Sequence, residues 1–114
     1  MLYRTCRLLQ VLQPTNAAEA RRMLKSPEKL TVGWFTASWC GPCKSITKKV
    51  ASLAELNAEK VSIVKIDIDE QPEVAQEYEV ESVPTFRFLK GGTLVDSVVG
   101  ANPDKLKDAI EKLK

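Results

Sequence analysis

Histidine is absent from this 114-residue chain, which excludes catalytic triads and general bases that depend on an imidazole. Cysteine is scarce, and the three in the chain fall short of the full Cys and His ligand set of a structural zinc site. No apolar run approaches the roughly 20 residues that a membrane span needs. The formal net charge of +2 is too small to indicate a nucleic-acid partner. We therefore expect no bound metal, no membrane segment and no nucleic acid.

The composition is ordinary for a soluble globular protein, because 44% of the residues are hydrophobic and 28% are charged. The length suits one domain over residues 1–114, with residues 1–7 as a short N-terminal extension, and we expect a monomer. An odd number of cysteines argues against a secreted disulfide scaffold. A reducing compartment is therefore favoured, and we expect the cytoplasm.

The N-terminal residues leave a second compartment open. Arg4 and Arg7 are basic and no acidic residue precedes Glu19, which loosely matches a mitochondrial presequence. The alternative is a short basic segment that leads into a first strand. No uninterrupted apolar segment follows these residues, so we expect no secretory signal. Cys6 has no partner motif nearby, and it is expected to be unreactive, with regulatory oxidation or dimer crosslinking as the alternative.

Hydrophobic periodicity predicts nine secondary-structure elements. Strands are expected at residues 8–12, 31–37, 61–68, 85–89 and 93–99, and helices at 17–25, from 42 onward, at 72–78 and from 103 onward. The order β-α-β-α-β-α-β-β-α predicts parallel strands joined by right-handed crossovers, followed by an antiparallel hairpin. The expected fold class is therefore α/β, with a mixed central sheet flanked by helices.

Local signals support this order of elements. Asn16 and Asn102 stand where a helix N-cap is expected, and Gly91-Gly92 indicates a tight hairpin turn. Segment 31–37 is β-branched, aromatic and almost continuously apolar, which predicts a strand covered on both faces. The helix from residue 42 is expected to turn one set of residues toward the core: Cys43, Ile46, Val50, Leu53 and Ala54.

The motif Trp39-Cys40-Gly41-Pro42-Cys43 lies at the junction of the strand at 31–37 and the helix that follows. In an open α/β sheet, functional groups gather beyond the carboxyl ends of strands. Two cysteines at this spacing close a short loop, so their disulfide forms and breaks easily. The helix N-terminus favours an anionic sulfur and lowers the pKa of the Cys40 thiol. The alternatives are a structural crosslink, or half of a metal site shared between chains.

The positions of the two thiols predict different roles for them. Cys40 precedes the helix and is expected to be the exposed nucleophile, whereas Cys43 lies one turn inside and is expected to be shielded and to resolve the mixed disulfide. Gly41 leaves room for a substrate backbone, and Pro42 supplies a helical φ angle where no N–H is needed. Trp39 offers a flat apolar surface beside the reactive sulfur. No bound cofactor is expected, because the dithiol itself carries the electrons.

Segment 37–44 and the tripeptide Val83-Pro84-Thr85 resemble two signature motifs of thioredoxins, and the similarity extends over residues 8–113. The resemblance implies the thioredoxin fold, with a cis peptide bond before Pro84 that faces the dithiol. It also implies that the Val83 backbone pairs with an extended substrate strand while Pro84 prevents metal capture by the thiols. Gly100 and Ala101 would border the substrate groove.

One position departs from the family pattern. Thioredoxins usually carry a buried aspartate six residues before the first cysteine, where this chain has Trp34. In the family this acid is thought to help deprotonate the resolving cysteine, together with a lysine that Lys65 matches. Trp34 cannot accept a proton, and we expect it to fill the core with its indole N–H bonded to an acceptor. We therefore expect Lys65 to favour the Cys43 thiolate without a carboxylate, with water or the departing thiolate taking the proton.

The resemblance implies that the protein reduces protein disulfides and maintains redox homeostasis. The implied partners are disulfide-containing client proteins and an electron donor, either a thioredoxin reductase, which is an NADPH-dependent flavoprotein, or a low-molecular-weight dithiol. Two other functions stay open. One is a disulfide oxidase or isomerase of the same fold, and the other is a non-catalytic module that binds a partner through the groove at Trp39 and Pro84.

Overall fold

A five-stranded mixed sheet forms the centre of the computed structural model, which describes residues 11–114. The strands lie in the order β1-β3-β2-β4-β5; β1, β3 and β2 are parallel, and β4 and β5 are antiparallel to their neighbours. The predicted mixed α/β sheet is confirmed. The N-terminal extension, the two arginines and Cys6 lie outside the described residues. The strands are β1 (Val11–Leu12), β2 (Leu30–Thr36), β3 (Val61–Asp67), β4 (Thr85–Lys90) and β5 (Thr93–Val99).

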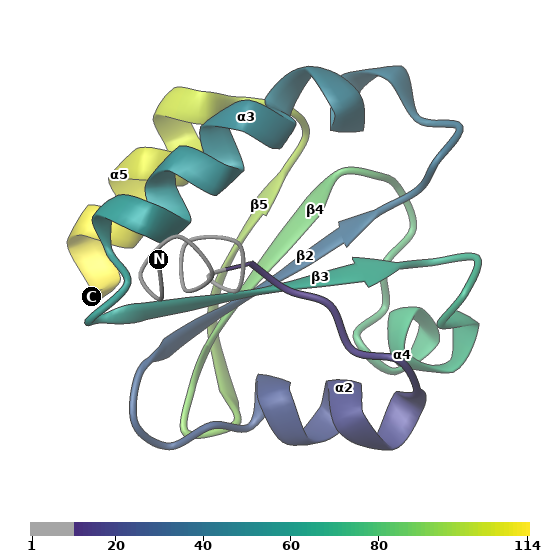
Figure 1. Cartoon of the computed structure of the whole chain (residues 1–114), viewed down its shortest axis with the longest axis horizontal. Coiled ribbons are helices and arrows are strands. Elements are labelled where there is room, and N and C mark those ends of the chain that lie inside the picture. Colours follow the sequence, from purple (N-terminus) through teal and green to yellow (C-terminus); the bar gives the residue numbers. More distant parts are fainter. Residues whose placement is uncertain (1–10) are drawn as a thin grey trace, which may run out of the picture.

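Four helices within residues 11–114 cover the two faces of this sheet (Figure 1). One face carries α3 (Gly41–Leu56) and α5 (Pro103–Leu113), and the other carries α2 (Ala17–Leu24) and α4 (Pro72–Glu77). All seven residues of β2 are buried, as predicted for a central strand covered on both sides. Successive side chains of β2 point to opposite faces of the sheet. Trp34 packs in the hydrophobic cluster under α3, and Phe35 packs in the cluster under α2.

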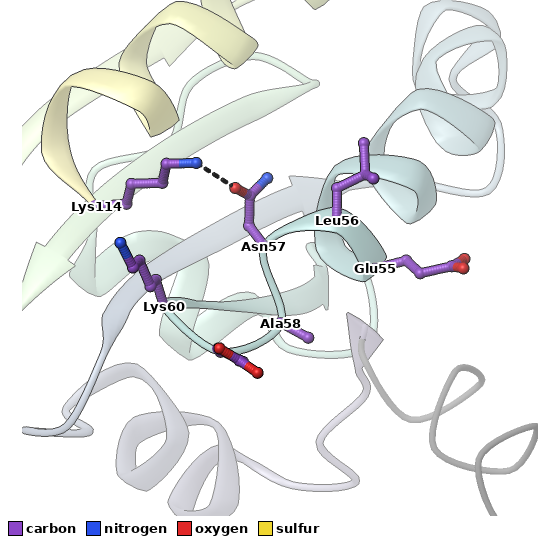
Figure 2. A pocket seen from close by; sticks show the side chains of 7 residues that line it. Glu55, Leu56, Asn57, Ala58, Lys60 and Lys114 are labelled. Atoms are coloured by element: carbon purple, nitrogen blue, oxygen red, sulfur yellow. Dashed lines mark hydrogen bonds between the residues drawn. The ribbon is translucent and has the colours of Figure 1, made fainter.

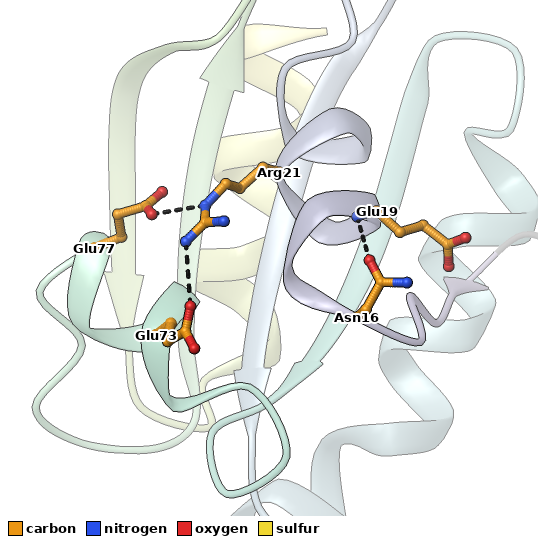
Figure 3. Close-up of polar contacts among 5 residues, drawn as sticks. All are labelled: Asn16, Glu19, Arg21, Glu73 and Glu77. Atoms are coloured by element: carbon orange, nitrogen blue, oxygen red, sulfur yellow. Dashed lines mark hydrogen bonds and ion pairs between the residues drawn. The ribbon is translucent and has the colours of Figure 1, made fainter.

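Asparagine side chains cap two of the helices, as predicted. Asn16 Oδ1 accepts a hydrogen bond from the Glu19 N–H at 2.8 Å at the start of α2 (Figure 3). Asn102 Oδ1 accepts one from the Lys105 N–H at 3.1 Å at the start of α5. Each bond satisfies one of the N–H groups that the first turn of a helix leaves without a partner.

Replacing Asn102 with alanine is expected to lower the free energy of unfolding by about 1 kcal/mol, because the Lys105 N–H loses its acceptor. Urea denaturation followed by circular dichroism measures this loss. Asn102→Asp keeps an acceptor oxygen and should retain most of the stability. An unchanged denaturation midpoint in Asn102→Ala would show that the cap does not stabilise α5.

Arg21 joins α2 to α4 on the face of the sheet opposite α3 (Figures 1 and 3). Its Nε atom lies 2.7 Å from Glu77 Oε1, and its Nη2 atom lies 3.7 Å from Glu73 Oε2. Ion pairs on the surface contribute only about 0–1 kcal/mol each. Arg21 therefore links α4 to α2 and adds little to the stability of the fold.

Arg87 anchors the segment that leads from α4 to β4. Its Nε donates to Tyr78 O at 3.1 Å, and its Nη2 donates to Glu79 O at 3.0 Å. Glu79 has a φ angle of 54°, a left-handed conformation that non-glycine residues seldom adopt. These two bonds hold the chain in place just before Val83 and Pro84, which the sequence marks as part of the site.

The β4–β5 hairpin closes as its paired glycines predict. Gly91 and Gly92 have φ angles of 56° and 84°, and Lys90 pairs with Thr93 across the turn. Positive φ at both central residues is the geometry of a two-residue type I′ turn. In this arrangement β5 is an edge strand of the sheet, and Gly100 directly follows its last residue.

Candidate active site

Cys40 is the N-cap of α3 and lies beyond the carboxyl end of β2. It forms a disulfide with Cys43, and the two Cα atoms are 5.3 Å apart. The Cys43 backbone N–H also donates to Cys40 Sγ, at an N–S distance of 3.2 Å. This sulfur lies at the positive end of the α3 dipole, which favours the thiolate when the disulfide is reduced. Cys43 belongs to the buried face of α3 that the sequence predicts.

The expectation that Cys40 is exposed is wrong for the disulfide form. Only 4% of its surface is exposed, compared with 1% for Cys43. The two cysteines and Ala37 form a small buried cluster, and the partly buried Ile68 and Val83 pack against it. Cys40 Sγ lies 3.7 Å from Val83 O. The sulfur is therefore covered by a loop that is distant in sequence, although Cys40 is still the more exposed of the two thiols.

The loop that covers the sulfur comes from the second motif. The Val83–Pro84 peptide bond is cis, as the family resemblance implies. Pro84 O accepts a hydrogen bond from the Gly100 N–H at 2.8 Å, and Ala101 packs against the core on the α3 side of the sheet. The fold thus links the Val83–Pro84 loop, which contacts Cys40 through Val83, to Gly100 at the end of β5.

Trp39 stands on the surface next to the dithiol, with 65% of its area exposed. Its indole Nε1–H donates to Asp69 Oδ2 at 2.8 Å, and this bond orients the ring. Asp69 was missed by sequence reasoning because it belongs to no motif. Its place just after β3 is the signal that could have found it, since the carboxyl ends of neighbouring parallel strands meet at one edge of the sheet.

Trp34 fills the core as predicted, but its indole N–H does not form the expected hydrogen bond with any described residue. The residue is 2% exposed, and its Nε1 has no hydrogen-bond partner among the described residues. Its ring stacks on Phe86 with centroids 6.3 Å apart, and Lys65 Nζ lies 5.5 Å from the ring centroid. These contacts use the faces of the ring, whereas the N–H lies at its edge. Trp34 therefore contacts Lys65 through its π system.

A cavity of about 370 Å³ lies beside the resolving thiol, and we call it the Cys43 cavity. It is bounded by the first turns of α3 and by the ends of β2 and β3. Its charged lining residues are Lys44, Lys65 and Asp67, and its other lining residues are Thr36, Ala37, Ser38, Cys43 and Thr47. The buried Cys43 thiol, two lysine side chains and one carboxylate therefore line the same cavity. The carboxylate of Asp67 belongs to no motif that the sequence analysis identified.

A second hollow lies at the other end of α3, a helix of 16 residues and about 24 Å in length (Figure 2). Lys114 borders it and donates to Asn57 Oδ1 at 2.8 Å. It contains no cysteine. Within residues 11–114, no group of three or more His, Cys, Asp or Glu residues could hold a metal ion. None of the helices in this part of the chain combines the length and the hydrophobicity of a transmembrane span.

A disulfide in the first turn of a helix that follows a parallel strand, next to a cis-proline loop, places two cysteines where thiol–disulfide exchange is possible. The family profile described as Thioredoxin matches residues 11–112. The chain belongs to the thioredoxin family.

Individual relatives agree with this assignment. Thioredoxin-2 of Pyricularia oryzae is 47% identical over 96 residues, which is 84% of this chain but 55% of that protein. Thioredoxin-2 of Saccharomyces cerevisiae is 46% identical over 100 residues, 88% of this chain and 95% of that protein. The crystal structure of thioredoxin NaTrxh from Nicotiana alata has a TM-score of 0.86 at 37% identity and covers 92% of this chain and 93% of that one. The chain therefore spans little more than half of the first relative and nearly all of the second.

Proposed function

We propose that this chain is a protein disulfide reductase, and the Cys40–Cys43 disulfide at the start of α3 carries the proposal. In the reduced protein, the Cys40 thiolate attacks a client disulfide and forms a mixed disulfide. Cys43 then attacks Cys40, releases the second client thiolate and closes the internal disulfide. One disulfide is formed for each one broken, and two electrons pass from the dithiol to the client.

Client binding is proposed on the surface around Cys40. Gly41 and Pro42 are exposed, and a Cβ atom at Gly41 would meet nothing within 4 Å, so an extended segment has room above the start of α3. The Val83 carbonyl lies next to the Cys40 sulfur, where a client strand can pair with backbone groups. The proposed binding surface consists of Trp39, Gly41, Pro42, Val83, Pro84, Gly100 and Ala101.

The proposed clients are disulfide-containing proteins. Electrons would come from a thioredoxin reductase or from a low-molecular-weight dithiol. No bound cofactor is required for this cycle, because the two sulfurs carry both electrons. We propose a monomer in the cytoplasm, with the mitochondrion as the second candidate because of Arg4 and Arg7. Sedimentation equilibrium tests the monomeric state, and cell fractionation tests the compartment.

Reduction of insulin by dithiothreitol tests the proposed activity. We expect the folded protein to accelerate the reaction over dithiothreitol alone, and its disulfide to have a reduction potential near about −270 mV. A potential near about −120 mV would instead identify a disulfide oxidase. A folded protein without activity would overturn the proposal in favour of a module that only binds partners.

A further inference from the structure

We propose that the Asp67 carboxylate accepts the proton of the Cys43 thiol through water in the Cys43 cavity. This inference rests on the proposed reductase function, because it concerns the step in which Cys43 resolves the mixed disulfide. It replaces the expectation, drawn from the sequence, that no carboxylate takes part in this step.

The resolving thiol needs a proton acceptor. Cys43 is 1% exposed, and a thiol attacks a disulfide only as the thiolate. Trp34 has no basic atom, and the Lys65 ammonium has donors but no acceptor. Histidine is absent from the chain. Among the residues that line the Cys43 cavity, Asp67 supplies the single carboxylate.

The register of the sheet places Asp67 on the same side as Cys43. In the parallel pair of β2 and β3, Trp34 is the partner of Lys65 and Thr36 is the partner of Asp67. Residues two apart in a strand point to the same face, so Asp67 shares the face of Trp34, which packs in the cluster under α3. Cys43 lies on the buried side of α3. The thiol and the carboxylate therefore reach the cavity from two elements that face each other.

The turn after β3 holds the Asp67 side chain in place. Asp67 Oδ1 accepts hydrogen bonds from the Asp69 N–H at 2.8 Å and from the Glu70 N–H at 3.2 Å, and neither bond uses Oδ2. The cavity volume of about 370 Å³ is large compared with the roughly 30 Å³ that a water molecule occupies in the liquid. A short chain of water can therefore join the carboxylate to the thiol.

The other charged groups around the cavity favour proton loss from the thiol. Lys44 of α3 and Lys65 of β3 both line it, and their positive charges stabilise the Cys43 thiolate as it forms. β2 contributes no charged residue to the lining. The Asp69 carboxylate, in the turn after β3, is bonded to the indole at the surface. Asp67 thus accepts the proton while two cations stabilise the charge left on sulfur.

The proposed step balances without a further reagent. The proton leaves Cys43 Sγ and reaches Asp67 through water. The Cys43 thiolate attacks Cys40 Sγ, the Cys40–Cys43 bond forms, and the bond between Cys40 and the client sulfur breaks. The client sulfur leaves with the electron pair and takes a proton from water, and Asp67 returns its proton to the solvent.

Stopped-flow reaction with the aromatic disulfide dithiobis-nitrobenzoate isolates this step. All variants carry Cys6→Ser in the full chain, so that only Cys40 and Cys43 react. Attack by Cys40 releases the first coloured thiolate, and resolution by Cys43 releases the second. In Asp67→Asn we expect the second release to slow about 100-fold near neutral pH, the lower end of what a general base contributes, with the first release unchanged. The difference should disappear above about pH 8.5, where a free thiol ionises unaided.

The matched control is Glu70→Gln, which removes an equal charge from a side chain that does not line the cavity, and it should leave both releases unchanged. In Asp67→Asn the new amide oxygen can still accept the two turn N–H groups, and added acetate should accelerate the second release. A second release with the wild-type rate and pH profile, or one slowed equally at every pH, would overturn the inference. Insulin reduction by the wild type reports separately on the reductase function.

Discussion

Cys40→Ser is expected to abolish the reduction of insulin, leaving only the rate of the dithiothreitol donor. A serine hydroxyl is a weak nucleophile at neutral pH and cannot form a disulfide. The hydroxyl can still accept the Cys43 N–H that the sulfur accepts here, so the start of α3 should keep its cap. Loss of activity would therefore report on the chemistry of the sulfur and not on unfolding. Insulin turbidity measures the rate, and circular dichroism confirms the fold.

Cys43→Ser is the matched variant, because it separates attack from resolution. Its Cys40 thiolate should still attack a client disulfide but should remain joined to the client, since no second thiol displaces it. Non-reducing electrophoresis should show the mixed disulfide with Cys43→Ser and none with Cys40→Ser. The reverse pattern would mean that the two cysteines exchange the roles assigned to them.

Trp34→Ala is expected to lower the free energy of unfolding by about 3–5 kcal/mol, the usual loss for a large aromatic side chain in a core. Trp34 is 2% exposed, stacks on Phe86 and contacts the Lys65 ammonium through its ring. Alanine would leave a void between β2 and α3 and remove these contacts. Urea denaturation of the disulfide form, followed by circular dichroism, measures the change.

Two control variants show whether the loss of stability comes from the buried ring of Trp34. Trp39→Ala removes a tryptophan that is 65% exposed and should change stability far less than Trp34→Ala. Trp34→Phe keeps a ring and deletes an indole N–H that has no partner among the described residues, so it should cost less than the alanine variant. If Trp34→Ala and Trp39→Ala lowered stability equally, Trp34 would not have the packing role that its burial indicates.

Features that depend on neighbouring residues in the chain were predictable from the sequence. Asn16 and Asn102 cap helices because an N-cap needs only a short acceptor side chain and the N–H three residues on. Gly91 and Gly92 adopt positive φ because both central residues of the turn require it. The buried face of α3 follows from helical periodicity, and Cys43 was placed on it correctly.

Features that depend on a distant segment were not predictable in the same way. Cys40 is more deeply buried than expected because Val83, from another part of the chain, lies against its sulfur. The Trp34 N–H has no acceptor within residues 11–114, and the recorded contacts of its ring are with Phe86 and the Lys65 ammonium. Asp69 belongs to no motif, and only the meeting of strand ends brings it to the indole of Trp39.

The amino-acid sequence alone determined the order of elements, the position of the two thiols at a helix start and the family. These properties follow from periodicity and from short motifs, which act over a few residues. The tertiary structure alone decided what surrounds each sulfur: the loop over Cys40, and the cavity in which Cys43, Lys65 and Asp67 meet. The parallel pairing of β2 and β3 determines which side chains lie on the same face of the sheet. This register depends on how the two strands align, so it cannot be read from the sequence of either strand alone.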